Sequence, residues 1–352
     1  MSKSMMKGNV AIAEAALRAG LQFYAGYPIT PQTEVMEYLS GRIPQLQGRT
    51  FIQSESELSA INMVYGASAV GFRAMTSSSG PGMSLKQEGI SYMTRMELPC
   101  VILNVTRWGP GLGSLNTAQT DYLRDTRGGG QGGYRTIVLA PNSVQESVDL
   151  MQEAFDLAFK YQNPLVIMSE ANLGQMQEPC EMPDFKEIAA IPDWALNGDG
   201  QPRPGTRMMD PQDVAAHLKN KFQTIHENEQ RWQSLYTEDA EYIFVAFGLP
   251  SRAVMDAIDV LRARGEKVGL IRPITLWPFP EKAFAELGQQ VKAFISVEGT
   301  DLGQLVEDVA LTSKKLINRP VYLIAHGQAL PTVKQLVARF DDIKNGTEGA
   351  VM

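Results

Sequence analysis

The sequence predicts an α/β protein made of two doubly wound domains, because short apolar strands alternate with helical segments on both sides of an irregular connection. The connection begins near Glu178, where prolines punctuate a polar, glycine-containing stretch, and it continues into a charged helical segment. A new apolar strand begins at Tyr242. We therefore predict a first domain at 1–178, a linker with one long helix at 179–240 and a second domain at 241–352.

The first domain is expected to alternate apolar strands with helices, an order that produces a parallel sheet covered on both faces. Its strands are predicted at 21–24, 50–53, 73–76, 101–106, 136–139 and 164–168. Its helices are predicted at 10–19, 31–39, 58–70, 82–93 and 144–159. The carboxyl ends of such strands meet at one edge of the sheet, where open α/β folds bind ligands.

The second domain repeats this alternation after a linker helix that we predict at about 212–235. Its strands are predicted at 242–248, 268–273, 294–297 and 321–325. Its helices are predicted at 252–264, about 280–288 and about 301–314. The polar end of the chain, about 341–352, is expected to be frayed.

Composition is that of an ordinary globular protein. The chain has 352 residues, 44% hydrophobic and 20% charged, and no run approaches the ~18 apolar residues of a membrane span. Glu14 and Arg18 interrupt any signal-peptide core, so we expect a cytoplasmic location and no membrane partner. The net charge of −7, without a long basic cluster, argues against a nucleic-acid partner.

Cysteine and histidine residues are few and lie far apart in the sequence. Cys100 and Cys180 are the two cysteines of the chain, too few for a four-cysteine iron–sulfur or zinc site. Each is expected to be a buried or surface thiol. The histidines, His217, His226 and His326, have no metal-ligand spacing. We therefore predict no metal site and no catalytic histidine.

The stretch from Gly26 to Glu57 contains two strand-to-helix junctions, whose loops should meet at the ligand-binding edge of the sheet. Thr30 is predicted to be the N-cap of a helix that begins at Pro31. Glu57 begins an apolar helix face, whereas Glu55 is expected to face solvent or a loop. A carboxylate on an apolar face is typical of a functional residue, but an acid that only caps the first helical turn would look the same.

Three glycine-rich loops allow more than one interpretation. Residues 77–82 join a strand to a helix, so their backbone N–H groups could hold an anion, or they form a simple tight turn. Residues 109–113 lack the spacing of a dinucleotide-binding loop, and the Walker pattern is absent. Residues 128–133 are interpreted as a mobile loop or a partner contact.

Charged residues near these loops are further candidates. Arg107 ends the strand at 101–106, where its guanidinium fork could bind a carboxylate. An ion pair between strands or domains is the alternative. Lys86 and Glu88, on the helix after the serine loop, are expected to form a solvated or intersubunit pair.

Together these residues resemble the α subunit of 2-oxoacid:ferredoxin oxidoreductases, and the resemblance extends over essentially the whole chain. Trp108 departs from the family pattern, which has a small residue beside the arginine, and this departure concerns the shape of the substrate pocket. Within the family the chain is most similar to the 3-methyl-2-oxobutanoate (2-oxoisovalerate) type, which in turn is similar to the 2-oxoglutarate type. The matching segments are Tyr-Pro-Ile-Thr-Pro at 27–31, Gln-Ser-Glu-Ser-Glu at 53–57, Thr-Ser-Ser-Ser-Gly-Pro-Gly at 76–82, Arg107, and Arg-Pro-Ile-Thr-Leu-Trp-Pro-Phe-Pro at 272–280.

The resemblance implies a pyrimidine-binding domain of the thiamine-diphosphate enzymes followed by a transketolase C-terminal-like domain. It implies a β subunit that holds the diphosphate, Mg²⁺ and a [4Fe–4S] cluster, a γ subunit and often a ferredoxin-like δ subunit, in a dimer of hetero-oligomers that reduces an external ferredoxin. Gly198-Asp199-Gly200 is similar to the Mg²⁺ motif of thiamine-diphosphate enzymes. We reject it as a metal site, because no apolar strand precedes it and no paired asparagines follow it.

The resemblance also implies roles for single residues. Glu57 would hydrogen-bond N1′ of the aminopyrimidine, Arg107 would hold the substrate carboxylate, and Thr30 would donate a hydrogen bond near substrate and coenzyme A. The implied reaction is oxidative decarboxylation of a 2-oxoacid, preferably branched-chain, with coenzyme A as co-substrate. The residues expected to contact the cofactor are Glu57, Ile29, Thr30, Ser79 and Gly80.

Three alternatives remain open at this point. The substrate could be 2-oxoglutarate or an indole- or arylpyruvate, and an extra basic residue near the pocket would favour the dicarboxylate. A non-catalytic assembly protein of the same fold would be expected to have lost Glu57 or Thr30, and both are present. A self-contained nucleotide-binding oxidoreductase is disfavoured by the glycine spacings.

Overall fold

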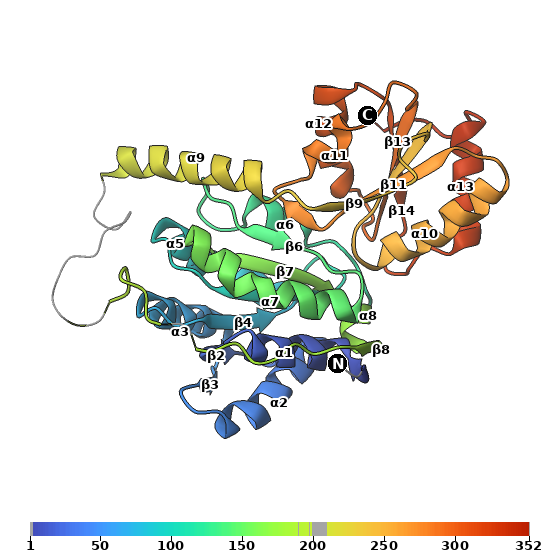
Figure 1. The fold of residues 1–352 in the computed structure, drawn as a ribbon. Coiled ribbons are helices and arrows are strands. Elements are labelled where there is room, and N and C mark those ends of the chain that lie inside the picture. Colours follow the sequence, from blue (N-terminus) through green and yellow to red (C-terminus); the bar gives the residue numbers. More distant parts are fainter. Residues whose placement is uncertain (1–2, 189, 197, 199–209, 352) are drawn as a thin grey trace.

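A computed structural model of the chain describes residues 3–188, 190–196, 198 and 210–351. Its first domain is built on a seven-stranded sheet that is parallel except at one edge (Figure 1). The central strands are fully buried, as their apolar sequences require. The order of strands across the sheet is β12 (Thr275–Trp277), β6 (Ile137–Leu139), β7 (Leu165–Glu170), β5 (Val101–Thr106), β4 (Ala74–Ser78), β2 (Phe23–Gly26) and β3 (Thr50–Gln53).

Two groups of helices cover this sheet. One group packs around α1 (Gly8–Arg18), which contacts α2, α7 and α8, and the other around α3 (Glu57–Ala69), which contacts α4 and α5. Right-handed crossovers place the groups on opposite faces, because the strand order changes direction after β3. The remaining elements are α2 (Thr33–Arg42), the short 3₁₀ helix Ile43–Gln45, α4 (Gly80–Leu85), α5 (Gln87–Arg95), α6 (Tyr122–Arg127), α7 (Val144–Tyr161) and α8 (Ala171–Gln175).

The second domain has a five-stranded sheet in which β9 alone runs antiparallel. Helices α10 and α13 pack together, as do α11 and α12. The strand order is β14 (Val321–Ala325), β13 (Ala293–Glu298), β10 (Tyr242–Val245), β11 (Val268–Pro273) and β9 (Trp232–Leu235). The helices are α10 (Gly248–Ala263), α11 (Glu281–Ala285), α12 (Leu305–Leu316) and α13 (Val333–Lys344).

Helix α9 (Pro211–Asn228) and strand β12 link the two domains. Helix α9 leads from the first domain toward the second, with Asp210 accepting a hydrogen bond as its N-cap (Figure 1). Strand β12 then returns from the second domain and pairs with β6 in the first sheet. A separate two-stranded sheet joins β1 (Ser4–Lys7) to β8 (Gln177–Cys180).

The α/β fold with two doubly wound sheets is confirmed, and four strands occupy the predicted residues: β3, β5, β11 and β14. The linker helix was predicted too long, because residues 232–235 pair with β11 as a strand. The frayed end was also predicted wrongly, since α13 continues to Lys344 and Ile343 is buried against the core. Thr332 and Gln335 form a capping box at its start, a signal that is visible in the sequence.

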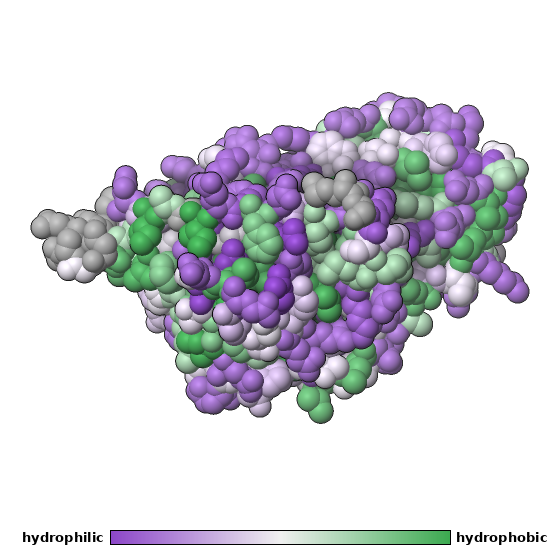
Figure 2. Space-filling model, turned by 60° about the horizontal axis from the view of Figure 1, so that its bottom comes forward, coloured by the Kyte–Doolittle hydropathy of each residue, from purple (hydrophilic) through white to green (hydrophobic). Residues whose placement is uncertain are grey.

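The surface has no unusual composition on the face that Figure 2 shows, where hydrophobic and hydrophilic groups are interspersed. Folded proteins always keep apolar area on their surfaces, so this mixture is expected. None of the helices in the described part of the chain combines the length and the apolar character that a bilayer crossing requires.

Candidate functional site

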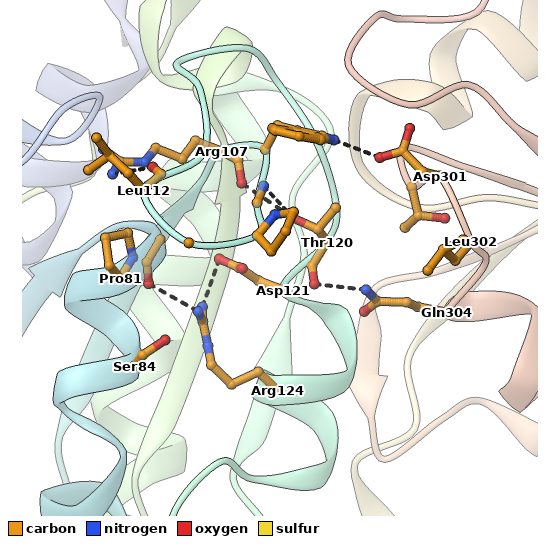
Figure 3. A pocket seen from close by; sticks show the side chains of 16 residues that line it. Pro81, Ser84, Arg107, Leu112, Thr120, Asp121, Arg124, Asp301, Leu302 and Gln304 are labelled. Atoms are coloured by element: carbon orange, nitrogen blue, oxygen red, sulfur yellow. Dashed lines mark hydrogen bonds and ion pairs between the residues drawn. The ribbon is translucent and has the colours of Figure 1, made fainter.

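An interdomain cavity of about 670 Å³ lies at the carboxyl ends of the strands of the first sheet. The loop after β5 and the start of α4 form its wall in the first domain, and the loop between β13 and α12 closes it from the second domain (Figure 3). This is the sheet edge at which the sequence predicts ligand binding. The lining residues used below are Gly80, Pro81, Arg107, Trp108, Leu112, Asp121, Arg124, Asp301 and Leu302.

Arg107 is the cation of this cavity that has no carboxylate partner among the described residues. It is only 5% exposed, yet its Nη1 and Nη2 donate to carbonyl oxygens, those of Thr30 at 2.7 Å and Leu112 at 2.9 Å. Its Nε is buried without a partner. The alternative ion pair is therefore not formed here, and the positive charge is left for an anion.

Gly80 is required beside this arginine. It has a φ of +47°, and a Cβ at this position would lie 2.9 Å from Arg107 Nε. The neighbouring Ser79 Oγ is buried and has no hydrogen-bond partner in the described structure. Ser79 and Gly80 are two of the residues expected to contact the cofactor: Gly80 packs directly against the guanidinium, and the Ser79 hydroxyl is a buried polar group left without a partner in the described structure.

Thr30 lies at the same edge, but its predicted role as an N-cap is wrong. Helix α2 begins at Thr33, and Gln32 occupies the N-cap position without a side-chain cap. A turn closed by Gln32 N–H and the Ile29 carbonyl precedes the helix. The Thr30 side chain is exposed and its carbonyl accepts from Arg107, while Ile29 is half-buried.

Glu57 is the first residue of α3, after Ser56, whose Oγ accepts from Ser59 N–H as the N-cap. As predicted, Glu57 is buried, at 5% exposure, and Glu55 is exposed. None of the described residues donates a hydrogen bond to the Glu57 carboxylate. A Cβ on Gly82 would lie 2.3 Å from Glu57 Oε1, so the carboxylate packs directly against this glycine.

The structure does not bring Glu57 and Arg107 into one cavity. Gly80 and Pro81 of α4 line the interdomain cavity with Arg107, whereas Gly82 faces Glu57 and Ser78. The first turn of α4 therefore separates the two halves of the predicted site. Ser78 Oγ, next to the Glu57 carboxylate, is buried without a partner within the described residues, so each half retains an unsatisfied polar group.

Arg124, which sequence reasoning missed, is the second cation of the cavity, and carboxylates balance its positive charge. It forms an ion pair with Asp121 at 2.7 Å, which Figure 3 shows. It forms a second ion pair with Asp125 at 3.2 Å, and its Nη1 donates to the Gly80 carbonyl. Burial raises the pKa of Asp125 to about 6, although Arg124 opposes this shift. The spacing of Asp121, Arg124 and Asp125 on one helical turn was the available sequence signal.

Lys86 contradicts the prediction of a solvated or intersubunit pair with Glu88. Its side chain is fully buried, and Nζ donates to Thr76 Oγ1 at 3.0 Å and to the Glu57 carbonyl at 3.3 Å. The predicted single helix is broken at Lys86 into α4 and α5, which turns this side chain inward while Glu88 stays exposed. Burial lowers the pKa of Lys86 to about 7, against a smaller opposing effect of Glu57.

Lys86 should make stability rise with pH. Its ordinary pKa of 10.5 applies to the unfolded chain, whereas the folded value is about 7. Between these values the unfolded chain binds more protons, so the free energy of unfolding increases as pH rises from 7 to 10. We expect K86M to lose this increase, which amounts to ~1 kcal/mol per pH unit.

Melting temperatures of the wild type and K86M across pH 7–10 measure this difference. The control is K334M, a substitution of an exposed lysine on α13. If wild type and K86M differ by the same amount at every pH, Lys86 is not a buried, titrating amine.

Three features of the sequence remain: the two cysteines, the 128–133 loop and the Gly-Asp-Gly motif at 198–200. Cys100 and Cys180 are free and buried, as expected for ordinary thiols. The 128–133 loop lies against α5: Gly129 N–H donates to Gln87 Oε1, and Ser91 Oγ donates to the Gln131 carbonyl. Its movement or contact with a partner stays a prediction. The rejected motif at 198–200 falls largely outside the described residues.

The sequence matches two known protein families. Residues 14–242 match the family described as "Pyruvate flavodoxin/ferredoxin oxidoreductase, thiamine diP-bdg", and residues 240–336 match "Pyruvate:ferredoxin oxidoreductase core domain II". Ketoisovalerate oxidoreductase subunit VorB of Methanothermobacter marburgensis is 47% identical over 331 residues, which cover 91% of this chain and 93% of that protein. 2-Oxoglutarate synthase subunit KorA of Methanocaldococcus jannaschii is 35% identical over 345 residues, covering 90% and 93%.

Solved structures agree with these sequence matches. The 2-oxoglutarate:ferredoxin oxidoreductase from Magnetococcus marinus, with 2-oxoglutarate, coenzyme A and succinyl-CoA bound, superposes with a TM-score of 0.84 at 26% identity. The match covers 97% of this chain and 65% of that one. A split-gene transketolase, at 14% identity and a TM-score of 0.62, shares the fold over 96% of this chain and 97% of its own. The resemblance found in the sequence is confirmed: the chain belongs to the 2-oxoacid:ferredoxin oxidoreductase family, as one of the subunits of these enzymes.

Proposed function

We propose that this chain is the α subunit that holds the 2-oxoacid carboxylate and the pyrimidine end of thiamine diphosphate in a 2-oxoacid:ferredoxin oxidoreductase. The reaction converts a 2-oxoacid anion and coenzyme A into acyl-CoA, CO₂ and one proton, and two electrons pass to ferredoxin. The observation that carries this proposal is Arg107, a buried guanidinium without a carboxylate partner in the described structure, at the wall of the interdomain cavity. A substrate carboxylate supplies the missing negative charge.

The Glu57 carboxylate fits the pyrimidine end of the cofactor. It is buried and receives no hydrogen bond from the described residues, so it can accept one from N1′ of an aminopyrimidine. Because Gly82 has no side chain, the Glu57 carboxylate can lie directly against the first turn of α4. Thiamine diphosphate supplies a nucleophilic carbon and an electron sink. The contribution of Glu57 is to hold a proton at N1′, and we assign Ser79, whose buried hydroxyl has no partner among the described residues, to the cofactor as well.

The charges of the cavity favour a monocarboxylic substrate. Arg107 can bind one carboxylate, while Arg124 is neutralised by Asp121 and Asp125. Leu112 and Leu302, which are 79% and 92% exposed, line the cavity with apolar surface. We therefore favour a branched-chain 2-oxoacid over 2-oxoglutarate, in line with the ketoisovalerate-type relative. 2-Oxoglutarate is the alternative, because the second relative and the superposed enzyme act on or bind it.

We assign the diphosphate, Mg²⁺ and [4Fe–4S] cluster to a β subunit, and expect a γ subunit, a ferredoxin-like δ subunit and a cytoplasmic complex. Two cysteines in the whole chain are fewer than the four that a cluster needs. Leu58 and Leu85, which adjoin Glu57 and Lys86 in sequence, are large apolar side chains left exposed on α3 and α4. Exposed apolar side chains beside a buried carboxylate suit a face that the β subunit covers.

Native mass and cofactor analysis of the protein, purified without oxygen from its own cells, tests this proposal. We expect smaller chains, thiamine diphosphate and iron to accompany it. The complex should reduce a viologen dye with coenzyme A and one member of a panel that includes 2-oxoisovalerate, 2-oxoglutarate and an arylpyruvate. A chain that is active alone and without cofactor, or a complete complex inert toward every 2-oxoacid, would refute the proposal.

A further inference from the structure

Trp108, the residue that departs from the family pattern, connects the two domains beside the interdomain cavity. Its indole Nε1 donates to Asp301 Oδ2 at 2.6 Å, and both residues line the cavity. Figure 3 shows this hydrogen bond on the side of the second domain, with Leu302 next to Asp301. Because Trp108 directly follows Arg107, the bond places a carboxylate in the same cavity as the substrate-binding guanidinium.

The first-domain partner is held firmly. Trp108 N–H donates to the Asn116 carbonyl, and its own carbonyl accepts from Ser114 N–H, both at 3.0 Å. Gly113 has a φ of +67°, and a Cβ there would lie 1.7 Å from the Trp108 carbonyl. The glycine-rich loop at 109–113 thus folds tightly against Trp108 and fixes its main chain, while the indole is held by its hydrogen bond to Asp301.

The loop that carries Asp301 is fixed as well. Buried Glu298, at the end of β13, accepts hydrogen bonds from the N–H groups of Gln304, Leu305 and Val306 at the start of α12. Gln304 in turn donates to the Thr120 carbonyl at 2.8 Å (Figure 3). Asp301 is exposed and lies between these anchors, and its hydrogen bond to the Trp108 indole directs its carboxylate toward the cavity.

The other charged side chains of the cavity leave the negative charge of Asp301 unpaired. Arg124 is paired with Asp121 and Asp125, and Arg107 is reserved for the carboxylate of the 2-oxoacid under the proposed function. Asp301 forms its one described side-chain hydrogen bond with a neutral indole, so its negative charge is not cancelled. A substrate with a second carboxylate would bring this group into a cavity whose unpaired charge is negative.

We propose that the Trp108–Asp301 pair is the specificity element of this cavity: Asp301 repels a second carboxylate, and Trp108 both positions Asp301 and supplies an apolar wall for an aliphatic side chain. Specificity arises here from an element that acts against the wrong substrate. This inference rests on the proposed function, since it names what the same site excludes.

The test compares kcat/KM for 2-oxoisovalerate and 2-oxoglutarate in the assembled complex. D301N removes the charge but keeps an oxygen that can accept from the indole, so it isolates the electrostatic part. We expect the preference for 2-oxoisovalerate over 2-oxoglutarate to fall by about 10-fold or more, mainly through a lower KM for 2-oxoglutarate. The wild-type preference should also weaken at high salt, whereas the D301N preference should not.

Two further variants separate charge from shape. W108F keeps an aromatic wall but cannot donate to Asp301, and we expect a partial loss of preference. D259N changes an exposed aspartate on α10 and makes the same change in net charge away from the cavity, so its preference should equal that of the wild type.

The outcomes distinguish this inference from the proposed function. If the wild-type complex turns over 2-oxoisovalerate and the preference of D301N stays within about twofold of the wild-type preference, this inference is overturned and the proposed function stands. A wild type that prefers 2-oxoglutarate also overturns it but leaves 2-oxoacid oxidation standing. A complex inert toward every 2-oxoacid removes the proposed function itself.

Discussion

Replacing Glu57 by glutamine should leave the complex assembled and lower its turnover of 2-oxoacids by on the order of 10²–10⁴-fold. Glutamine has nearly the size of glutamate, so the contact with Gly82 and the start of α3 are preserved. The amide cannot carry the negative charge that stabilises a proton at N1′ of the cofactor. The loss therefore falls on kcat rather than on folding or subunit association.

Three measurements on E57Q show whether the loss is in turnover or in assembly: native mass, thiamine diphosphate content and kcat with saturating 2-oxoacid and coenzyme A. The matched control is E55Q, the same chemical change two residues away on the exposed side of the chain, where the carboxylate accepts a hydrogen bond from Ser59 Oγ. We expect E55Q to stay within about twofold of the wild type, as surface changes usually do. Near-normal turnover by E57Q would remove Glu57 from its assigned role.

The burial of Glu57 was predictable because it depends on a local pattern. A helix brings residues three and four apart onto one face, so the apolar residues after Glu57 already indicate that its side chain points inward. The strands were predictable for a similar reason, since an apolar run such as β5 has one stable place, the centre of a covered sheet. These parts of the site follow from periodicity and chain direction.

Lys86 shows why other parts were not predictable. A lysine on a mixed helical segment is usually solvated, and only the break between α4 and α5 turns it toward Thr76 and the Glu57 carbonyl. The three-residue strand β12, between two prolines, is too short to show any period. Trp108 and Asp301 are 193 positions apart. Each of these features depends on how distant elements pack, which no local pattern contains.

Replacing Arg107 by lysine should lower kcat/KM for the 2-oxoacid by on the order of 10²–10³-fold, most of it through a higher KM. The guanidinium donates from both Nη atoms to the Thr30 and Leu112 carbonyls and still has a buried, unpartnered Nε. An ammonium group is a single point charge on a flexible stem and cannot keep both carbonyls while it binds a carboxylate. The charge is retained in R107K, so the loss measures geometry.

The KM for coenzyme A separates this role from a general collapse of the cavity. If Arg107 binds the 2-oxoacid carboxylate, R107K should raise the KM for the 2-oxoacid while the KM for coenzyme A and the thiamine diphosphate content stay near wild-type values. R264K is the control, because Arg264 forms its ion pair with Asp341 on the surface of the second domain. Equal increases in both KM values would mean that Arg107 supports the loop at Leu112 rather than the substrate. A kcat/KM within about threefold of the wild type would mean that another group binds the carboxylate, and Arg124 would then have to leave Asp121 to do so.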